Sequence, residues 1–348
     1  MYDAIHFDSG MPASAWRGVI GRHVGDRAKR MRHTNPSSLL NAAARTLLER
    51  VHRAARPPMH ELTAPQARQF YDMGAPILDL QPAPLVDRVQ DLHIPARDGY
   101  AMPARLYAPQ SETPLPVLLY IHGGGFSVGS LTTHDVLCRQ LSREGHCAVI
   151  SLDYRLAPEH RFPTAVHDSW DALNWVIQQG QAWGLDTARV AVGGDSAGGT
   201  LGAVCALMAR DAGLDLRLQL LFYPGCGARQ STASHTTFAH GFMLDKATVD
   251  WFFANYIDDA DRDDWRFAPS LAPDHTGLAP AWIGLAECDP LVDEGIHYAD
   301  LLRMAGVAVD LEIYRGVIHG FITMGRAIPD ALKAHADAGR ALKNAFES

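Results

Sequence analysis

One serine stands in a sequence context that favours nucleophilic chemistry. Ser196 is the middle residue of the pentapeptide GDSAG at positions 194–198, which follows an apolar run at Val190–Val192 and precedes a stretch of helical pattern. This is the G-x-S-x-G pattern of a strand–turn–helix junction, which exposes the serine hydroxyl at the carboxyl end of a strand. The residues two positions before and after such a serine must be small, and both are glycine here. The pattern predicts that Ser196 is a nucleophile; the alternative is a structural serine in a turn.

Three consecutive glycines follow His122, directly after another apolar run at Pro116–Ile121. Glycines let the backbone approach a ligand closely and turn its N–H groups toward it. A tetrahedral acyl intermediate needs such donors around its oxyanion. A phosphate-binding loop would need a Gly-Lys-Ser/Thr ending, and a dinucleotide site would need G-x-G-x-x-G; neither pattern is present. We therefore interpret the glycines as part of an oxyanion hole.

A serine nucleophile requires a base, and the base requires an acid that orients it. Asp289 follows the apolar run Trp282–Ala286 and precedes a proline, which disfavours helix and leaves the aspartate in the loop where the strand ends. The neighbouring Asp293 and Glu294 are expected instead to cap the next helix and to favour its dipole, and Glu287 is expected to be a structural acceptor. Asp289 is therefore the predicted acid.

The predicted base is one of 17 histidines. In a fold with the order serine, acid, histidine, the base follows the acid by one further strand. His319 follows a strand-like segment ending near Tyr314, precedes the last helical stretch, and has a glycine beside it. This position selects His319.

An alternation of strand-like and helix-like segments from about Pro84 onward must position these residues. The predicted strands are 86–93, 100–107, 116–121, 147–154, 190–192, 216–222, 282–286 and 307–314, and the predicted helices are 133–144, 165–179, 197–212, 293–305 and 329–346. Most of the strands are continuous apolar runs, which is typical of strands covered on both faces. The turn pair at Asp98 favours a hairpin between the first two strands. The predicted class is α/β: a mostly parallel sheet with an antiparallel hairpin at its edge and helices on both faces.

Two stretches do not follow this alternation. Residues 1–83 have helical spacing of apolar residues and no evident strand, and a long insertion at about 229–268 contains a predicted aromatic helix at Met243–Ile257. An apolar helical insertion at the carboxyl end of a strand is a candidate lid over a cleft; the alternative is an extension of the core. The predicted catalytic domain is 84–348. A basic run, Arg17–His33, is interpreted as a solvated segment, and no role is assigned to residues 1–32.

Composition excludes several classes of protein. The 348 residues are 47% apolar and 20% charged, with a formal charge of −8, which is ordinary for a globular protein and unlike a nucleic-acid binder. The five cysteines have no C-x-x-C spacing, so neither a zinc site nor a disulfide framework is expected. We expect no signal peptide and no membrane span, and hence a cytoplasmic location.

The motifs, taken together, resemble those of the hormone-sensitive-lipase-like family of α/β-hydrolase esterases. In chain order they are HGGG at 122–125, DYRLAPE at 153–159, GDSAGG at 194–199, DPL at 289–291 with DE at 293–294, and HGF at 319–321. The match runs from about Pro84 to the C-terminus. The resemblance also implies a helical cap built from the N-terminal stretch and the mid-chain insertion, which are the two stretches that break the alternation.

The resemblance implies a carboxylesterase that acts on small-molecule esters of short-to-medium chain length and needs no metal or organic cofactor. It implies a nucleophile, a base and an acid at Ser196, His319 and Asp289, and oxyanion donors from the backbones of Gly124, Gly125 and Ala197. The DYRLAPE segment is expected to be a structural turn. Three alternatives stay open: an amidase, a lipase for long acyl chains, and a non-catalytic ligand-binding protein on the same scaffold. The family resemblance is compatible with a monomer or a homodimer.

Overall fold

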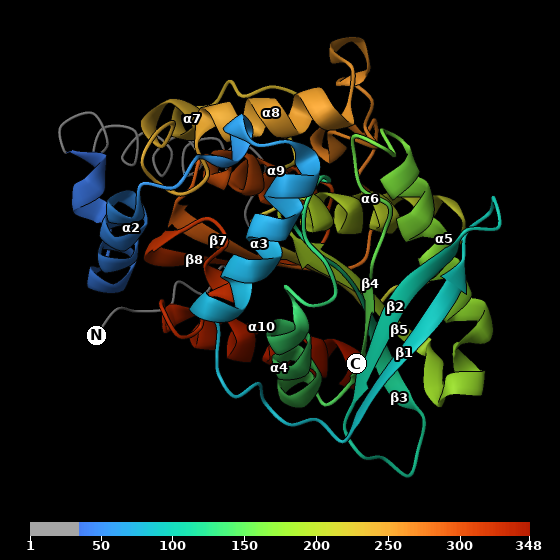
Figure 1. Cartoon of the computed structure of the whole chain (residues 1–348). Helices are drawn as coiled ribbons and strands as arrows, with labels where there is room; N and C mark the ends of the chain where they lie inside the picture. Colours follow the sequence, from blue (N-terminus) through green and yellow to red (C-terminus); the bar gives the residue numbers. More distant parts are fainter. Residues whose placement is uncertain (1–34) are drawn as a thin grey trace, which may run out of the picture. The chain divides into compact units, whose positions relative to one another are not determined.

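A single eight-stranded sheet organises the chain, as the computed structural model of residues 35–348 shows (Figure 1). The strands are β1 (Arg88–Pro95), β2 (Ala101–Ala108), β3 (Leu115–Ile121), β4 (Ala148–Leu152), β5 (Leu185–Asp195), β6 (Leu218–Phe222), β7 (Ala281–Cys288) and β8 (Val309–Ile318). Their order in the sheet is β1-β2-β4-β3-β5-β6-β7-β8. Only β2 runs antiparallel to its neighbours, and all the other pairs are parallel. The predicted α/β fold with an antiparallel edge hairpin is confirmed.

Nine described α-helices accompany the sheet. They are α2 (Ala42–Ala54), α3 (Ala64–Leu78), α4 (Asp135–Gly145), α5 (Thr164–Gln179), α6 (Ala197–Asp211), α7 (Ala233–Thr237), α8 (Lys246–Tyr256), α9 (Val292–Met304) and, at the end of the chain, α10 (Asp330–Glu347), of which α7 is a single short turn. Short 3-10 helices lie at Pro36–Leu39, Met59–Glu61, Gly180–Trp183, Asp259–Asp261, Pro269–Leu271 and Phe321–Thr323. The first of these belongs to a separate unit, residues 1–39, and the remainder of the chain forms the other unit. The basic run Arg17–His33 and the unassigned residues 1–32 lie outside the described residues.

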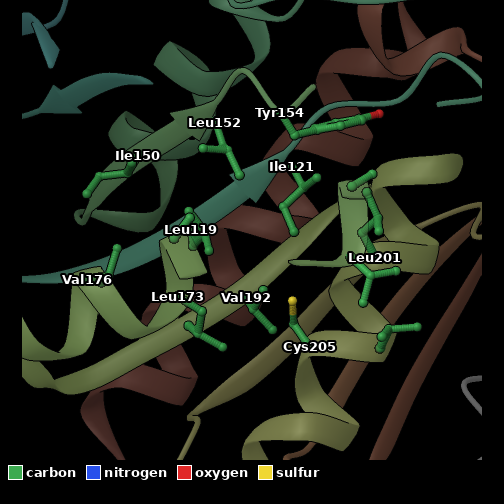
Figure 2. Packing of buried hydrophobic residues seen from close by; sticks show 14 of the residues in the cluster. Leu119, Ile121, Ile150, Leu152, Tyr154, Leu173, Val176, Val192, Leu201 and Cys205 are labelled. Atoms are coloured by element: carbon green, nitrogen blue, oxygen red, sulfur yellow. The ribbon is translucent and has the colours of Figure 1, made fainter. Parts of the chain in front are cut away.

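The main core fills the space between the sheet and helices α5 and α6. Alternate residues of the central strands, among them Leu119, Ile150 and Val192, point toward Leu173 of α5 and Leu201 of α6 (Figure 2). All five are at most 1% exposed. Helices α4 and α10 pack against one another and against the strands from the other side (Figure 1). Both faces of the central strands are therefore covered, which explains their continuous apolar sequences.

Strands β5, β7 and β8 continue past the carboxyl ends predicted for them, and these extensions matter for the site. Strand β5 begins at Leu185, because this residue pairs with Leu115 of β3 even though the polar residues between Leu185 and Val190 gave no apolar run. Strands β7 and β8 continue past a β-bulge to the pair Cys288 and Ile318. The next residue of each strand is a predicted site residue. Backbone pairing therefore brings the ends of these two strands together.

The described parts of the two stretches outside the alternation, from residue 35 onward, are helical, as predicted, and they contact one another. Helices α2 and α3 precede the sheet, whereas α7 and α8 lie in the insertion between β6 and β7. A small apolar cluster, separate from the main core, joins Ala67 of α3 to Val249 and Phe252 of α8. His60 also contacts Thr248, with 3.4 Å between Nδ1 and Oγ1. Among residues 35–348, no helix combines the length and apolar character that crossing a bilayer requires.

Truncation of the central core should destabilise the fold strongly. Leu119→Ala removes a side chain with no exposed surface from the middle of β3, and we expect it to lower the free energy of unfolding by about 2–5 kcal/mol. Leu85→Ala, at a position that is 87% exposed, is the matched control and should change it by less than about 0.5 kcal/mol. Urea unfolding followed by circular dichroism measures both. Equal effects of the two substitutions would contradict the assigned core.

Candidate active site

Ser196 occupies a sharp turn between β5 and α6. Its backbone has φ +53° and ψ −121°, a conformation that side-chain-bearing residues rarely adopt. Its N–H donates to the carbonyl oxygen of Phe222 in the neighbouring strand, at 2.9 Å. The turn places the serine at the carboxyl end of the sheet and at the start of α6, which is the geometry that the GDSAG pattern predicts.

The two glycines of the pentapeptide are required by close packing against β3. A Cβ atom added at Gly194 would stand 2.1 Å from the carbonyl oxygen of Ile121, and one added at Gly198 would stand 2.0 Å from the same oxygen. Real Cβ atoms do not come this close to an oxygen, so any larger residue at either position would force β3 and the turn apart. The serine turn is therefore held directly against the strand that leads into the glycine loop.

Three of the predicted side chains form a continuous hydrogen-bonded chain. The Nε2 atom of His319 lies 2.9 Å from Ser196 Oγ, and its Nδ1 atom lies 2.6 Å from Asp289 Oδ2. The other oxygen of Asp289 accepts from the N–H of Leu291 at 2.8 Å. Asp289 has no exposed surface and His319 is 9% exposed. The acid is thus shielded from water, and the histidine joins it to a serine that faces a cavity.

The imidazole of His319 packs against Tyr223, which the sequence analysis did not single out. The ring centroids are 4.5 Å apart, and Tyr223 is fully buried. Its backbone has φ +33°, an unfavourable value for an aromatic residue that persists only where the surroundings enforce it. Two hydrogen bonds at opposite ends of an imidazole leave its tilt free, and the tyrosine ring restricts that tilt. One signal was available, since Tyr223 directly follows the apolar run of β6 at the edge where the other site residues lie.

The glycine loop presents unused backbone donors beside the serine. Gly124 and Gly125 have φ +121° and +56°, so the loop relies on residues without a Cβ. They line one cavity together with Ala197, Ser196 and His319. The N–H groups of Gly124, Gly125 and Ala197 donate to no group within the described part of the chain. Three donors are therefore available to a ligand next to Ser196 Oγ.

Asp195, the second residue of the pentapeptide, ties this loop to the serine turn. Its carboxylate accepts from the N–H of Gly123 at 2.9 Å and from the hydroxyl of Tyr120 at 2.7 Å, and it lies 3.1 Å from Nε2 of His134. Burial alone would raise the pKa of Asp195, but His134 and the Tyr120 hydroxyl outweigh it and hold that pKa below its usual value. A stable buried carboxylate thus fixes the start of the glycine loop. Sequence analysis gave Asp195 no role.

The expectation that Asp293 and Glu294 cap their own helix is wrong. Both lie in the first turn of α9, the place expected of acids that favour the helix dipole, but their carboxyl groups accept from other segments. Asp293 accepts from the N–H of Ser234 in α7 at 2.8 Å. Glu294 accepts from the N–H groups of Cys226 and Gly227 at 2.8 and 2.7 Å, and lies 3.2 Å from Nε2 of His235 in α7. These acids therefore hold the insertion.

Glu287 and the DYRLAPE segment make structural contacts, as expected. Glu287 is a structural acceptor, which binds the N–H of Gly316 at 3.0 Å and Arg315 at 2.6 Å. In the DYRLAPE segment, the hydroxyl of Tyr154 donates to the carbonyl oxygen of His122 at 3.1 Å, and Arg155 pairs with Asp168 at 2.6 Å.

None of the five cysteines forms a disulfide. Residues 35–348 contain no cluster of three or more histidine, cysteine, aspartate or glutamate side chains with metal-binding geometry.

The cavity beside Ser196 is small and mostly apolar. Its volume is about 160 Å³. Both helical stretches contribute to its wall, through Met59 and Tyr71 from the N-terminal part and Val249, Phe252 and Phe253 from α8. An ester placed here would have its carbonyl near Ser196 and its substituents against apolar side chains.

Comparison with known proteins defines the class. The model of a family described as having the alpha/beta hydrolase fold matches residues 118–323, which contain the glycine loop, Ser196, Asp289 and His319. The chain belongs to this family, and within it to the hormone-sensitive-lipase-like carboxylesterases. The predicted family and the predicted type of enzyme, a carboxylic ester hydrolase, are thereby confirmed.

Particular relatives agree with this class. An ethyl acetate hydrolase of Pseudomonas putida is 43% identical over 281 residues, which are 79% of this chain and 88% of the relative. A carboxylesterase of Mycobacterium tuberculosis is 44% identical over 253 residues, 71% of this chain and 79% of the relative. Among solved structures, an ester hydrolase from the metagenome of Lake Arreo has a TM-score of 0.85 at 39% identity and covers 89% of this chain and 100% of its own. A hyperthermophilic esterase of the archaeon Pyrobaculum calidifontis has a TM-score of 0.84 at 36% identity, with 88% and 98% covered.

Stability should decrease with rising pH through the ionisation of Glu294. Burial raises the pKa of Glu294 from 4.5 to about 8, against the opposing effect of the two N–H donors. The folded chain therefore holds this proton more tightly than the unfolded chain does. The contribution of Glu294 to stability is full below pH 4.5, falls as the pH rises to about 8, and is level above that.

Glu294→Gln keeps an oxygen acceptor for Cys226 and Gly227 but removes the ionisation. We expect the Tm of this variant, relative to that of the wild type, to be higher at about pH 8.5 than at about pH 5. Thermal unfolding at the two pH values measures the difference. A Tm difference between variant and wild type that is the same at both pH values would contradict the buried, proton-retaining state of Glu294.

Proposed function

We propose that this chain is a serine carboxylesterase that hydrolyses short-to-medium-chain carboxylic esters through an acyl-enzyme intermediate. The observation that carries the proposal is the chain from Ser196 Oγ through His319 to Asp289, with separations of 2.9 and 2.6 Å, next to three unused backbone donors. The names of the relatives, an ethyl acetate hydrolase and a carboxylesterase, support it independently.

In the first half of the reaction, Ser196 Oγ attacks the ester carbonyl carbon while Nε2 of His319 takes the hydroxyl proton. The carbonyl π-bond opens, and the negative charge on its oxygen is stabilised by the N–H groups of Gly124, Gly125 and Ala197. Each such donor contributes roughly 3 kcal/mol to the stability of the transition state. His319 then gives its proton to the alkoxy group, the C–O bond breaks, and an alcohol leaves.

In the second half, a water molecule attacks the acyl-enzyme and gives its proton to His319. The new tetrahedral intermediate collapses, the bond to Ser196 Oγ breaks, and His319 returns the proton to the serine. Asp289 keeps the imidazole in the tautomer that presents Nε2 as an acceptor and stabilises the imidazolium. No step calls for a metal ion or an organic cofactor.

The size of the cavity supports esters of limited length. Its volume of about 160 Å³ is close to that of an apolar cavity of roughly 150 Å³ that accommodates benzene. The walls contributed by the two helical stretches support the proposal that residues up to 83, in their described part, and the insertion at about 229–268 form a cap over this cavity. The proposal includes a cytoplasmic location, a monomeric or homodimeric state, and no nucleic-acid partner.

Replacement of the nucleophile should abolish turnover without unfolding the protein. Ser196→Ala is expected to retain the wild-type circular dichroism spectrum and to lose p-nitrophenyl butyrate hydrolysis by a factor of about 10⁴ or more. Ser111→Ala, at an exposed serine away from the cavity, is the control and should keep full activity. A Ser196→Ala enzyme whose rate of p-nitrophenyl butyrate hydrolysis stays within tenfold of the wild-type rate would contradict the proposed mechanism.

Acyl-chain length provides a second test. We expect kcat/KM for p-nitrophenyl esters to be highest for short and medium acyl chains and to fall for long ones, because a cavity of about 160 Å³ offers no apolar wall to the far end of a long chain. The measurement is kcat/KM for each ester of the series. Highest rates on emulsified long-chain esters would instead favour a lipase.

A further inference from the structure

The cap helix α8 contacts the glycine loop directly, through the ring of Phe252. A Cβ atom added at Gly125 would stand 2.1 Å from Phe252 Cγ and 2.3 and 2.4 Å from its two Cδ atoms. Three such similar distances place that point over the face of the ring. The ring therefore lies flat against the backbone of Gly125. Phe252 is 8% exposed and also lines the cavity beside Ser196.

The same helix holds the loop at a second point. Val128, four residues after Gly124, packs with Phe252, Val249 and Leu244 in the small apolar cluster that is separate from the main core. The carbonyl oxygen of Gly124 accepts from the N–H of Val128 at 3.0 Å. Movement of the Val128 side chain is therefore transmitted to the peptide of Gly124 within one turn. The glycine loop therefore contacts α8 at two points, Gly125 and Val128.

Backbone bonds within the loop hold the carbonyl oxygen of Gly124, which accepts from the N–H groups of Ser127 and Val128, both at 3.0 Å. Gly124 and Gly125 have left-handed backbone conformations, which glycine leaves as readily as it adopts, and their N–H groups have no acceptor within the described chain. Asp195 fixes only the preceding residue, Gly123, at 2.9 Å. The direction of the two unused donors therefore depends on these backbone bonds together with what packs against the loop, and the side chain of Phe252 covers Gly125.

We propose that Phe252 is a positioning residue for the oxyanion site, through which the cap helix holds the N–H groups of Gly124 and Gly125 in the direction of the reacting carbonyl oxygen. This inference rests on the proposed function. It has a consequence for substrate choice. An acyl chain too long for the cavity displaces the Phe252 ring, which releases the loop and weakens stabilisation of the oxyanion. Chain length is then discriminated in kcat, and not only in KM.

The test compares Phe252→Leu with Phe253→Leu, since Phe253 is the neighbouring residue of α8, lines the same cavity, and packs on Phe267 with the centroids 5.1 Å apart. With p-nitrophenyl butyrate, Phe252→Leu is expected to lower kcat by about tenfold or more, as for a weakened oxyanion donor, while KM changes by less than about threefold. Phe253→Leu, which alters the same cavity wall, should change KM or the preferred chain length, and any fall in kcat should be clearly smaller than in Phe252→Leu.

A trifluoromethyl ketone inhibitor separates positioning from packing. Its hemiketal with Ser196 carries an oxyanion, so its inhibition constant should rise in Phe252→Leu by the same factor as kcat falls. Across the ester series, wild-type kcat should fall with chain length, and this dependence should flatten in Phe252→Leu. Circular dichroism and Tm confirm that each variant is folded.

Three results would overturn the inference: an unchanged kcat in Phe252→Leu, an unchanged inhibition constant for the ketone, or a loss of kcat in Phe253→Leu as large as in Phe252→Leu. Failure of the proposed function would be recognised separately. In that case the wild-type enzyme itself would not be labelled at Ser196 by a phosphonate ester. Labelled wild-type enzyme with insensitive Phe252 variants would leave the esterase proposal intact and reject the positioning role alone.

Discussion

The site depends on one close contact, that of the serine turn with the carbonyl oxygen of Ile121 at the end of β3. Gly194 and Gly198 approach this oxygen from two sides, and neither position has room for a Cβ. The contact fixes the distance between the turn that carries Ser196 and the strand that leads into the glycine loop. Nucleophile and oxyanion donors come from different motifs, and this packing makes them a single unit. The strained backbone of Ser196 is sustained by the surrounding core.

Strand pairing brings Asp289 and His319 to the serine turn. Register between β7 and β8 ends at the pair Cys288 and Ile318, so Asp289 and His319 leave the sheet side by side. A shift of the β7–β8 register by one residue would displace Asp289 relative to His319. It would also turn the side chains of the shifted strand to the opposite face of the sheet. The pairing of β7 with β8 therefore determines that Asp289 and His319 can form their hydrogen bond. The Tyr223 ring restricts the remaining tilt of the imidazole.

Sequence reasoning predicted the fold and brought forward the three side chains that the structure joins, because each has a local signature at the end of an apolar strand. It failed where partners are distant in the chain. Nothing local to Glu294 indicates that it accepts from Cys226 and Gly227, so helix capping was the natural but wrong expectation. Asp195 was passed over because its partners Tyr120 and His134 lie more than 60 residues away. Contacts of this kind follow from topology, which a single sequence does not specify pair by pair.

The hexapeptide from Asp289 to Glu294 has three attachments within six residues. Its first carboxylate binds His319, and its last two hold Ser234 in α7 and the loop at Cys226. In a chimera that carried the insertion of another esterase, Asp293 and Glu294 would face a backbone whose N–H groups do not match their positions. The loop that carries Asp289 would then lose two of its attachments. Transplanting the insertion between such enzymes therefore requires moving the acid loop as well.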